Sequence, residues 1–261
     1  MARTKNGKTN RPLPCPVPSC GMADTPLQPG TLYLVATPIG NLEDITLRAL
    51  RTLRECNVVA AEDTRRAGQL LKHFEIQKPL VSCHKFNEAR KSSSLCQRLS
   101  NGETVALVSD AGMPGISDPG QRLVRAALAA GARVEPVPGP CALVAALAAS
   151  GLPTEEFHFV GFPPRKSGAR RRQLEMLTEI PGTLVFYESP HRIGRLLAEL
   201  TALWPECPVV LCRELTKKFE EHLHGTAADL AARFKDRKAK GEFVVLCGEP
   251  RSALAKTSGD D

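Results

Sequence analysis

The sequence predicts an α/β fold with two domains, an N-terminal parallel sheet covered by helices and a smaller C-terminal α/β domain. From Thr31 onward, short apolar runs alternate with segments of helical period. The apolar runs are nearly continuous, as expected for strands buried on both faces of a parallel sheet. At 261 residues the chain is long for one compact domain and suits two. We expect the following organisation: a disordered leader at 1–29, domains at 30–150 and 151–250, and a tail at 251–261.

Five short apolar runs predict the strands of the first domain, and apolar residues at helical spacing predict helices between them. The strands are expected at 31–36, 57–61, 80–83, 104–108 and 133–137. The helical pattern is clearest in Leu42, Ile45, Ala49, Leu50 and Leu53, and in Ala67, Leu70, Leu71 and Phe74. A further helix is predicted from Pro140 to Leu147, because proline opens it and Gly151 follows its end. This helix is expected to lead out of the first domain.

The second domain is predicted from four more strand-like runs. They lie near 157–161, 183–187, 208–212 and 243–247. A basic stretch at 163–173 and a loop after Tyr187 interrupt the series. The sequence shows no internal repeat and no heptad run.

Composition excludes several classes of protein. No apolar run approaches the roughly 20 residues that a membrane helix needs, and the proline-rich first 29 residues lack the apolar core of a secretory signal. The nine cysteines are odd in number and form no C-x-x-C pair. We therefore expect free, mostly buried thiols in a reducing cytoplasm, with neither a disulfide framework nor a metal site.

Three loops follow predicted strand ends, where open α/β sheets place their ligands. They cover 36–41, 108–120 and 136–142, and all contain glycine and proline. In the second loop, Asp110 is a candidate to accept hydrogen bonds from an amine or from ribose hydroxyls. The alternatives are structural: tight turns, with Asn41 capping the next helix and Ser109 or Asp110 capping a turn.

Motifs that are absent from the sequence also narrow its function. There is no G-x-G-x-x-G after a strand, no P-loop, no H-E-x-x-H and no G-x-S-x-G. A nicotinamide dehydrogenase, a P-loop NTPase, a zincin and a serine hydrolase are therefore not supported. His222 and His224 lie beside Glu220 and Glu221, and we interpret them as a solvated patch.

Six motifs occur in an order that resembles the ribosomal RNA small-subunit methyltransferase I family, a tetrapyrrole-methylase-like class. They are Thr37-Pro38-Ile39-Gly40-Asn41-Leu42, Ala61-Glu62-Asp63-Thr64-Arg65, Ser109-Asp110-Ala111-Gly112, Pro138-Gly139-Pro140-Cys141-Ala142, Phe186-Tyr187-Glu188-Ser189-Pro190-His191-Arg192 and Arg213-Glu214-Leu215-Thr216-Lys217. The resemblance spans roughly 31–248. It implies a two-domain fold with S-adenosylmethionine in the cleft between the domains, a homodimer, and 2′-O-methylation of a cytidine in the decoding region of small-subunit ribosomal RNA.

Methyl transfer from a sulfonium needs no metal, but the attacking hydroxyl must be aligned and must lose its proton. Five ionisable residues in the resemblance motifs are unranked candidates for this role: Glu62, Asp63, Glu188, Glu214 and Lys217. Structural alternatives remain for several of them. Glu62 and Asp63 are also placed to cap the helix that follows, and Arg213 and Glu214 to form an ion pair at the domain interface.

The resemblance also favours a set of cofactor contacts, several of them through backbone atoms: Pro38, Asp110, Gly112, Ile116, Ala142 and Tyr187. For RNA, five cations in eight residues predict a flexible basic loop beside the cleft: Arg165, Lys166, Arg170, Arg171 and Arg172. The alternative is a solvated surface with no partner. A second basic run at 233–240 is interpreted as an exposed helix face.

Two other functions fit parts of the sequence. One keeps the fold and changes the acceptor to a small tetrapyrrole-like molecule, since a carboxylated macrocycle also favours cations. The other is a non-catalytic RNA-binding assembly factor on a methylase fold, although no charged residue replaces Gly112 in the cofactor-type loop.

Overall fold

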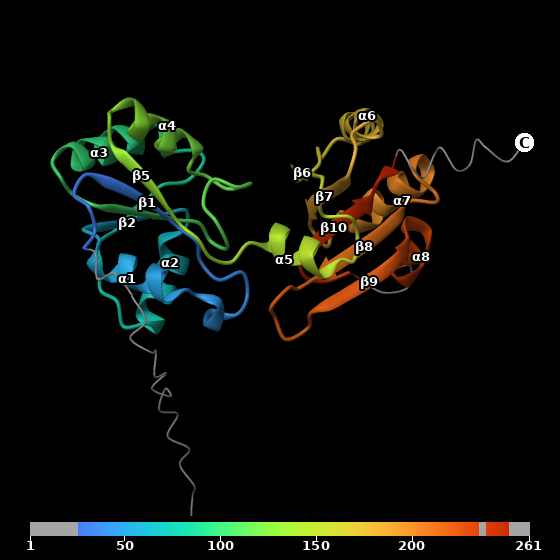
Figure 1. Cartoon of the computed structure of the whole chain (residues 1–261), viewed down its shortest axis with the longest axis horizontal. Coiled ribbons are helices and arrows are strands. Elements are labelled where there is room, and N and C mark those ends of the chain that lie inside the picture. Colours follow the sequence, from blue (N-terminus) through green and yellow to red (C-terminus); the bar gives the residue numbers. More distant parts are fainter. Residues whose placement is uncertain (1–25, 235–238, 251–261) are drawn as a thin grey trace, which may run out of the picture.

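The protein contains two five-stranded sheets, joined by a short helix (Figure 1). The computed structural model describes residues 26–234 and 239–250. The first sheet is parallel throughout, with strand order β3-β2-β4-β1-β5. Its strands are β1 (Thr31–Val35), β2 (Val58–Ala61), β3 (Leu80–Ser82), β4 (Val105–Val108) and β5 (Arg133–Val137). The predicted parallel sheet is confirmed.

Helices cover both faces of the first sheet, which explains why its strands are apolar on both sides. They are η1 (Leu42–Asp44), α1 (Leu47–Glu55), α2 (Thr64–His73), α3 (Glu88–Ser100) and α4 (Gln121–Ala129). Successive residues of β4 alternate between two cores: Ala106 and Val108 pack with α1 and α2, whereas Val105 and Leu107 pack with α3 and α4. The two cores fix the sheet, and therefore the loops at its carboxyl edge.

The second sheet is mixed, with strand order β6-β7-β10-β8-β9, and only β6 and β7 run parallel. Its strands are β6 (Phe157–Gly161), β7 (Thr183–Glu188), β8 (Pro208–Arg213), β9 (Glu221–Thr226) and β10 (Phe243–Gly248). The helices α6 (Ser167–Leu177), α7 (Ile193–Leu203) and α8 (Ala227–Arg233) pack on one face around the fully buried Trp204.

The helix α5 (Ala142–Ala149) links the two sheets (Figure 1). Its residues Ala146 and Leu147 pack on the face of the second sheet opposite α7, together with Ile39 from the loop after β1. A residue of the N-terminal part therefore joins the core of the C-terminal part. This contact brings the loops of both parts to one place.

One sequence-based expectation about the C-terminal part was wrong. The segment 163–173 is not a flexible loop, because α6 begins at Ser167. The patch containing His222 and His224 lies on the edge strand β9, paired with β8, and His224 is exposed there. Residues 235–238 of the second basic run, the leader as far as residue 25 and the tail from residue 251 lie outside the described residues. None of the described helices is long and apolar enough to cross a bilayer.

Candidate active site

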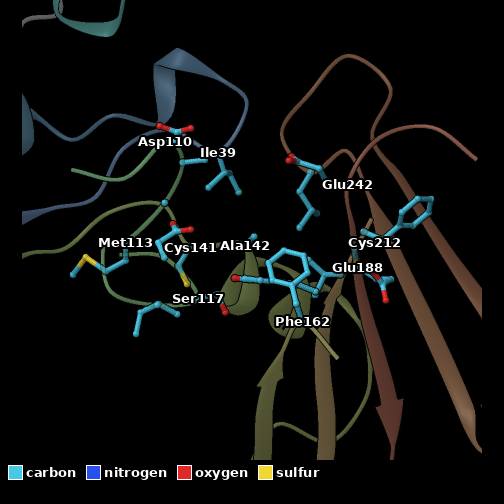
Figure 2. Close-up of a pocket in the computed structure, with 18 of the residues that line it drawn as sticks. Ile39, Asp110, Met113, Ser117, Cys141, Ala142, Phe162, Glu188, Cys212 and Glu242 are labelled. Carbon is cyan, nitrogen blue, oxygen red and sulfur yellow. The ribbon is translucent and has the colours of Figure 1, made fainter. Parts of the chain in front are cut away.

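A cleft of about 450 Å³ lies between the loops of the two sheets. Figure 2 shows Asp110 and Met113 on its N-terminal wall and Glu242 and Cys212 on its C-terminal wall, with Ala142 between them. Of the predicted site residues, nine line it: Glu62, Asp110, Gly112, Ile116, Ala142, Tyr187, Glu188, Glu214 and Lys217. Its size is within the range of small-molecule sites, about 300–1,000 Å³.

The N-terminal wall is built from two loops that are held together by backbone hydrogen bonds. Thr37 and Gly112 form an antiparallel bridge, in which each N–H donates to the other's carbonyl at 2.9 Å. The Thr37 hydroxyl donates to the Ser109 carbonyl at 3.2 Å. Gly112 has φ +80°, a conformation that favours glycine. The two loops thus form one rigid wall.

Three carboxylates meet on this wall: Glu62 after β2, and Asp110 and Asp118 in the loop after β4. Burial and the nearby charges of Asp118 and Asp110 raise the pKa of Glu62. Burial, and less strongly the charge of Asp110, also raise the pKa of Asp118, although a hydrogen bond from Ser109 opposes this. The wall therefore holds acids that bind protons more firmly than free carboxyl groups do.

Asp63 and Pro38, both predicted to be site residues, are not among the residues that line the cleft. Asp63 caps α2 instead: its carboxylate accepts from the Arg65 N–H at 2.9 Å and pairs with the Arg65 guanidinium. Hydrogen bonds from Arg65 lower the pKa of Asp63 well below its ordinary range. Of the capping alternatives, Asp63 fits and Glu62 does not, since Glu62 faces the cleft. Asn41 caps η1, as expected.

On the C-terminal wall the charges are paired. Lys217 Nζ lies 2.8 Å from Glu214 Oε1 and 2.9 Å from Glu242 Oε2. Burial acts to raise the pKa of Glu214, but the hydrogen bond from Lys217 acts against burial, and the pKa of Glu214 is lowered. The same hydrogen bond raises the pKa of Lys217 against the effect of burial. Of the structural alternatives, an ion pair between Arg213 and Glu214 does not form, because Arg213 pairs with Glu221 and Glu214 with Lys217.

Glu188 is the most deeply buried of the candidates, at 2% exposure. It accepts a hydrogen bond from the Ser189 N–H at 2.7 Å, and its other oxygen lies 3.0 Å from Arg192 Nη2. Burial raises the pKa of Glu188. Its contacts attach the end of β7 to the start of α7, which is a structural role.

Aromatic rings line the apolar part of the cleft. Tyr187 packs edge to face with Phe159 and Phe162, at centroid distances of 4.9 and 5.6 Å. The Tyr187 hydroxyl accepts a hydrogen bond from the Leu143 N–H at 3.1 Å. Burial raises the pKa of Tyr187 to about 12, so the hydroxyl stays neutral. Tyr187 thereby ties the second sheet to the first turn of α5.

Glycines allow the two walls to touch. A Cβ on Gly40 would lie 2.4 Å from Lys217 Cγ and 3.1 Å from the Leu215 carbonyl oxygen. Likewise, a Cβ on Gly161 would lie 2.9 Å from Ser117 Oγ. A side chain on Gly40 would push the walls apart, whereas one on Gly161 would crowd Ser117 and strain a backbone at φ +72°.

The five predicted RNA-contacting residues lie outside the cleft, at the start of α6. Arg170 is buried, at 3% exposure, and its guanidinium pairs with Glu199 at 2.6 and 2.7 Å. It also donates to the carbonyls of Pro164 and Arg165, so it holds the segment before α6 in place. Four of the set are exposed: Arg165, Lys166, Arg171 and Arg172.

Sequence reasoning missed several residues of the cleft: Ile39, Arg66, Met113, Ser117, Asp118, Cys141, Phe162, Cys212 and Glu242. Asp118 had a detectable signal, since it lies in the loop 108–120 that glycine and proline had marked. Glu242 had none, because it reaches the cleft only through the pairing of β10 with β8.

The described residues contain no group of three or more histidine, cysteine or acidic side chains arranged to hold a metal ion. His222 lies 2.8 Å from Glu220 Oε1 and 3.4 Å from Cys212 Sγ, and His224 bonds to the Ser150 carbonyl. All seven cysteines within the described residues are free thiols. The cleft thus offers carboxylates, backbone amides and aromatic rings, which suit a zwitterionic nucleoside and proton transfer.

Comparison with known families agrees with this geometry. Residues 31–231 match the family model of the tetrapyrrole (corrin/porphyrin) methylases. The chain is 51% identical to a ribosomal RNA small subunit methyltransferase I of Halalkalibacterium halodurans, over 83% of this chain and 75% of the relative. It is also 51% identical to the protein of that name from Pseudomonas aeruginosa, over 83% of this chain and 78% of the relative.

Solved structures with the same fold are more distant in sequence. A uroporphyrin-III C-methyltransferase from Thermus thermophilus, complexed with S-adenyl homocysteine, is 25% identical with a TM-score of 0.60. The alignment covers 84% of this chain and 98% of that one. A cobalt precorrin-4 methyltransferase is 19% identical with a TM-score of 0.62, covering 85% and 96% of the two chains. The second likeness concerns the fold alone.

Proposed function

The chain belongs to the tetrapyrrole (corrin/porphyrin) methylase family, and we propose that it transfers a methyl group from S-adenosylmethionine to the ribose 2′-hydroxyl of a cytidine in the decoding region of small-subunit ribosomal RNA. The observation that carries the proposal is the cleft: acids with raised pKa line one wall and aromatic rings the other. The acceptor follows from relatives of 51% identity that are named for the small-subunit RNA.

The residues of the cleft fit the methyl donor, which supplies an electrophilic methyl on a sulfonium. We assign its amine or ribose hydroxyls to Asp110, which lines the cleft and whose carboxylate also accepts from the Asp63 N–H at 3.2 Å and lies 3.4 Å from Arg66. Cys141, the N-cap of α5, makes no side-chain cap hydrogen bond, and the Leu143 N–H is used by Tyr187, so we assign the Ala142 N–H to polar ligand atoms. Gly112 lets backbone approach the ligand, and Ile116 and Tyr187 offer apolar surface. Pro38 does not line the cleft, so its proposed role is to fix the conformation of the loop after β1, which places Ile39 in the cleft.

We assign the proton of the ribose hydroxyl to Glu62. The hydroxyl oxygen forms a bond to the methyl carbon as the carbon–sulfur bond breaks, and the proton passes to the carboxylate of Glu62. A base is most effective when its pKa is near the working pH. The pKa of Glu62 is raised, whereas that of Glu214 is lowered and Lys217 is held as a cation. Asp63 and Glu188 are tied to Arg65 and Arg192.

The exposed cations before and in α6 are assigned to RNA phosphates. Arg165, Lys166, Arg171 and Arg172 are exposed, and the buried Arg170 holds their segment in position. Arg171 pairs with Glu175 at 2.9 Å, so its contribution is the smallest. We further propose that the enzyme works as a homodimer in the cytoplasm, a compartment that suits its free thiols.

The test is transfer of a labelled methyl group from S-adenosylmethionine to small ribosomal subunits from a strain that lacks this protein. Nuclease digestion and mass spectrometry then locate the label. A 2′-O-methylcytidine in one decoding-region fragment is the expected result. No label on subunits or naked RNA, with donor binding intact, would contradict the RNA assignment and favour a small tetrapyrrole-like acceptor. Failure to bind the donor would favour a non-catalytic assembly factor.

A further inference from the structure

The loop after β3 presents an aromatic side chain to solvent. Phe86 is 92% exposed, the highest value among the large apolar side chains that are exposed in the described part of the chain. Exposing a whole aromatic ring forgoes the favourable burial of its surface. Nearly the whole Phe86 side chain is therefore free to contact a partner.

The loop that carries Phe86 is ordered by its own hydrogen bonds. The Asn87 carboxamide oxygen accepts from the His84 N–H at 2.8 Å, and His84 Nδ1 accepts from the Phe86 N–H at 3.2 Å. The imidazole of His84 packs edge to face with Phe86 at a centroid distance of 6.1 Å. The ring is thus held outward by a defined turn.

The same loop is tied to the wall of the cleft in two ways. The Cys83 N–H donates to the Ala61 carbonyl at 2.8 Å, directly before Glu62, so Phe86 lies at most about 11 Å along the chain from this point. The buried carboxylate of Glu88 accepts from the N–H groups of Gly120 and Leu123, both at 3.1 Å. Glu88 therefore joins the start of α3 to the end of the loop that holds Asp110 and Asp118.

The charge around Phe86 is positive. Lys85 and Arg90 are exposed on the same segment, and Arg122 is exposed at the start of α4, which packs beside α3 (Figure 1). Glu88, the one acid between residues 83 and 93, is buried against backbone N–H groups. Cations around an aromatic face are the combination that binds single-stranded nucleic acid.

We propose that Phe86 is a stacking platform for an unpaired base of the RNA substrate, with Lys85, Arg90 and Arg122 contacting the adjacent phosphates. This inference rests on the proposed function. Phe86 would act as a positioning residue, which holds the strand so that the target ribose reaches Glu62. The role differs from that of the cations at α6, because a ring contacts a base whereas they contact phosphates.

The experiment measures methyl transfer to small subunits by the wild type and by Phe86→Ala, Phe86→Leu and Phe86→Tyr. Leu128→Ala, an exposed apolar position at the far end of α4, is the matched control. Base–aromatic stacking corresponds to about a 5-fold to 150-fold effect. We expect Phe86→Ala to raise KM for subunits by that factor with little change in kcat and in donor binding. Phe86→Tyr should restore KM and Phe86→Leu should not.

Each outcome decides the inference separately from the proposed function. If wild-type enzyme labels no RNA, the function itself fails. If it labels RNA and Phe86→Ala keeps the wild-type KM, the function stands and the platform is excluded. Restoration by Phe86→Leu as complete as by Phe86→Tyr would also overturn base stacking, and would indicate an apolar contact with a protein of the subunit.

Discussion

The two walls of the cleft hold their charges in different ways. On the N-terminal wall, Glu62, Asp110 and Asp118 are grouped with one another and with Arg66, which lies 3.4 Å from Asp110, and the pKa values of Glu62 and Asp118 are raised. On the C-terminal wall, Glu214 and Lys217 are paired, and both pKa values shift toward the charged form; Glu188 is paired with Arg192, although burial raises its pKa. Acids grouped together repel one another when ionised, which lowers the stability of the fold but leaves them able to exchange protons. Acids paired with cations stabilise the wall instead.

This contrast assigns different tasks to the two parts of the chain. The parallel sheet supplies loops at one edge, where acids from different strands converge. The mixed sheet supplies a scaffold of ion pairs, including Arg170–Glu199 and Arg192–Glu188. Substitutions on the first wall should therefore alter turnover, and those on the second should alter stability.

The largest expected effect is on turnover at Glu62. Glu62→Gln should lower kcat by about 10²- to 10⁴-fold, the range for loss of a general base, while donor binding persists. Glu214→Gln should lower kcat far less, because the Glu214 carboxylate is already paired with Lys217. The rate of single-turnover methyl transfer, measured for both variants, provides the comparison. A greater loss of kcat in Glu214→Gln would reverse the roles of the two walls.

The next effect is on the stability of the second part. Arg170→Ala should lower the free energy of unfolding by about 3–5 kcal/mol, because it leaves the Glu199 carboxylate without its partner in a largely buried site. Arg172→Ala, an exposed neighbour, should change it by less than about 0.5 kcal/mol. Urea unfolding curves provide the comparison. Equal midpoints for the two variants would contradict a structural role for Arg170.

A smaller effect tests the contact between the walls. Gly40 does not adopt a positive φ, but its Cβ would clash with the loop at Lys217; Gly115 has φ +85° and open space around it. Gly40→Ala should cost about 1–3 kcal/mol through overpacking, and Gly115→Ala about 1–2 kcal/mol through backbone strain. Only Gly40→Ala should weaken donor binding, measured by calorimetry. Equal weakening in Gly115→Ala would show that the walls do not depend on this contact.

The smallest effect is a dependence of stability on pH. The folded pKa of Glu62 lies above its ordinary value of 4.5, so the folded state binds its proton more firmly than the unfolded state. The stability that the protonated Glu62 contributes to the folded state is fully present below pH 4.5, and it is lost as pH rises through the folded pKa. Glu62→Gln should therefore unfold at a higher temperature than wild type at pH 8, with a smaller difference at pH 4. Calorimetric scans that show the reverse order would contradict a raised pKa. The kcat of the wild type should rise as pH rises through the folded pKa of Glu62, because only the ionised carboxylate can accept the proton.

The apolar strands could be predicted because burial on both faces leaves a plain sequence signal. All nine predicted strands are present, but β9 was missed. Its residues Glu221 to Thr226 are only half-buried at the sheet edge, so polar side chains there resembled a loop. The helix α6 was hidden in the same way, since its arginines masked the spacing of Leu174 and Leu177.

The site was predictable where its residues lie in loops directly after strands, as with Asp110 and Glu62. It was not predictable where the role depends on a partner distant in sequence. In the sequence Arg170 resembled its exposed neighbours, but in the structure it is buried and pairs with Glu199 on α7. Asp63 and Glu62 are adjacent in sequence, yet one caps α2 and the other faces the cleft.

The bridge between Thr37 and Gly112 also has a consequence for the kinetics of the enzyme. Since backbone hydrogen bonds already join the two loops, donor binding need not order them, and it forfeits little conformational entropy. Association should then follow a single step without a slow isomerisation. The amide protons of Thr37 and Gly112 should exchange slowly with deuterium even before the donor is added, as in a wall that is preorganised for its ligand.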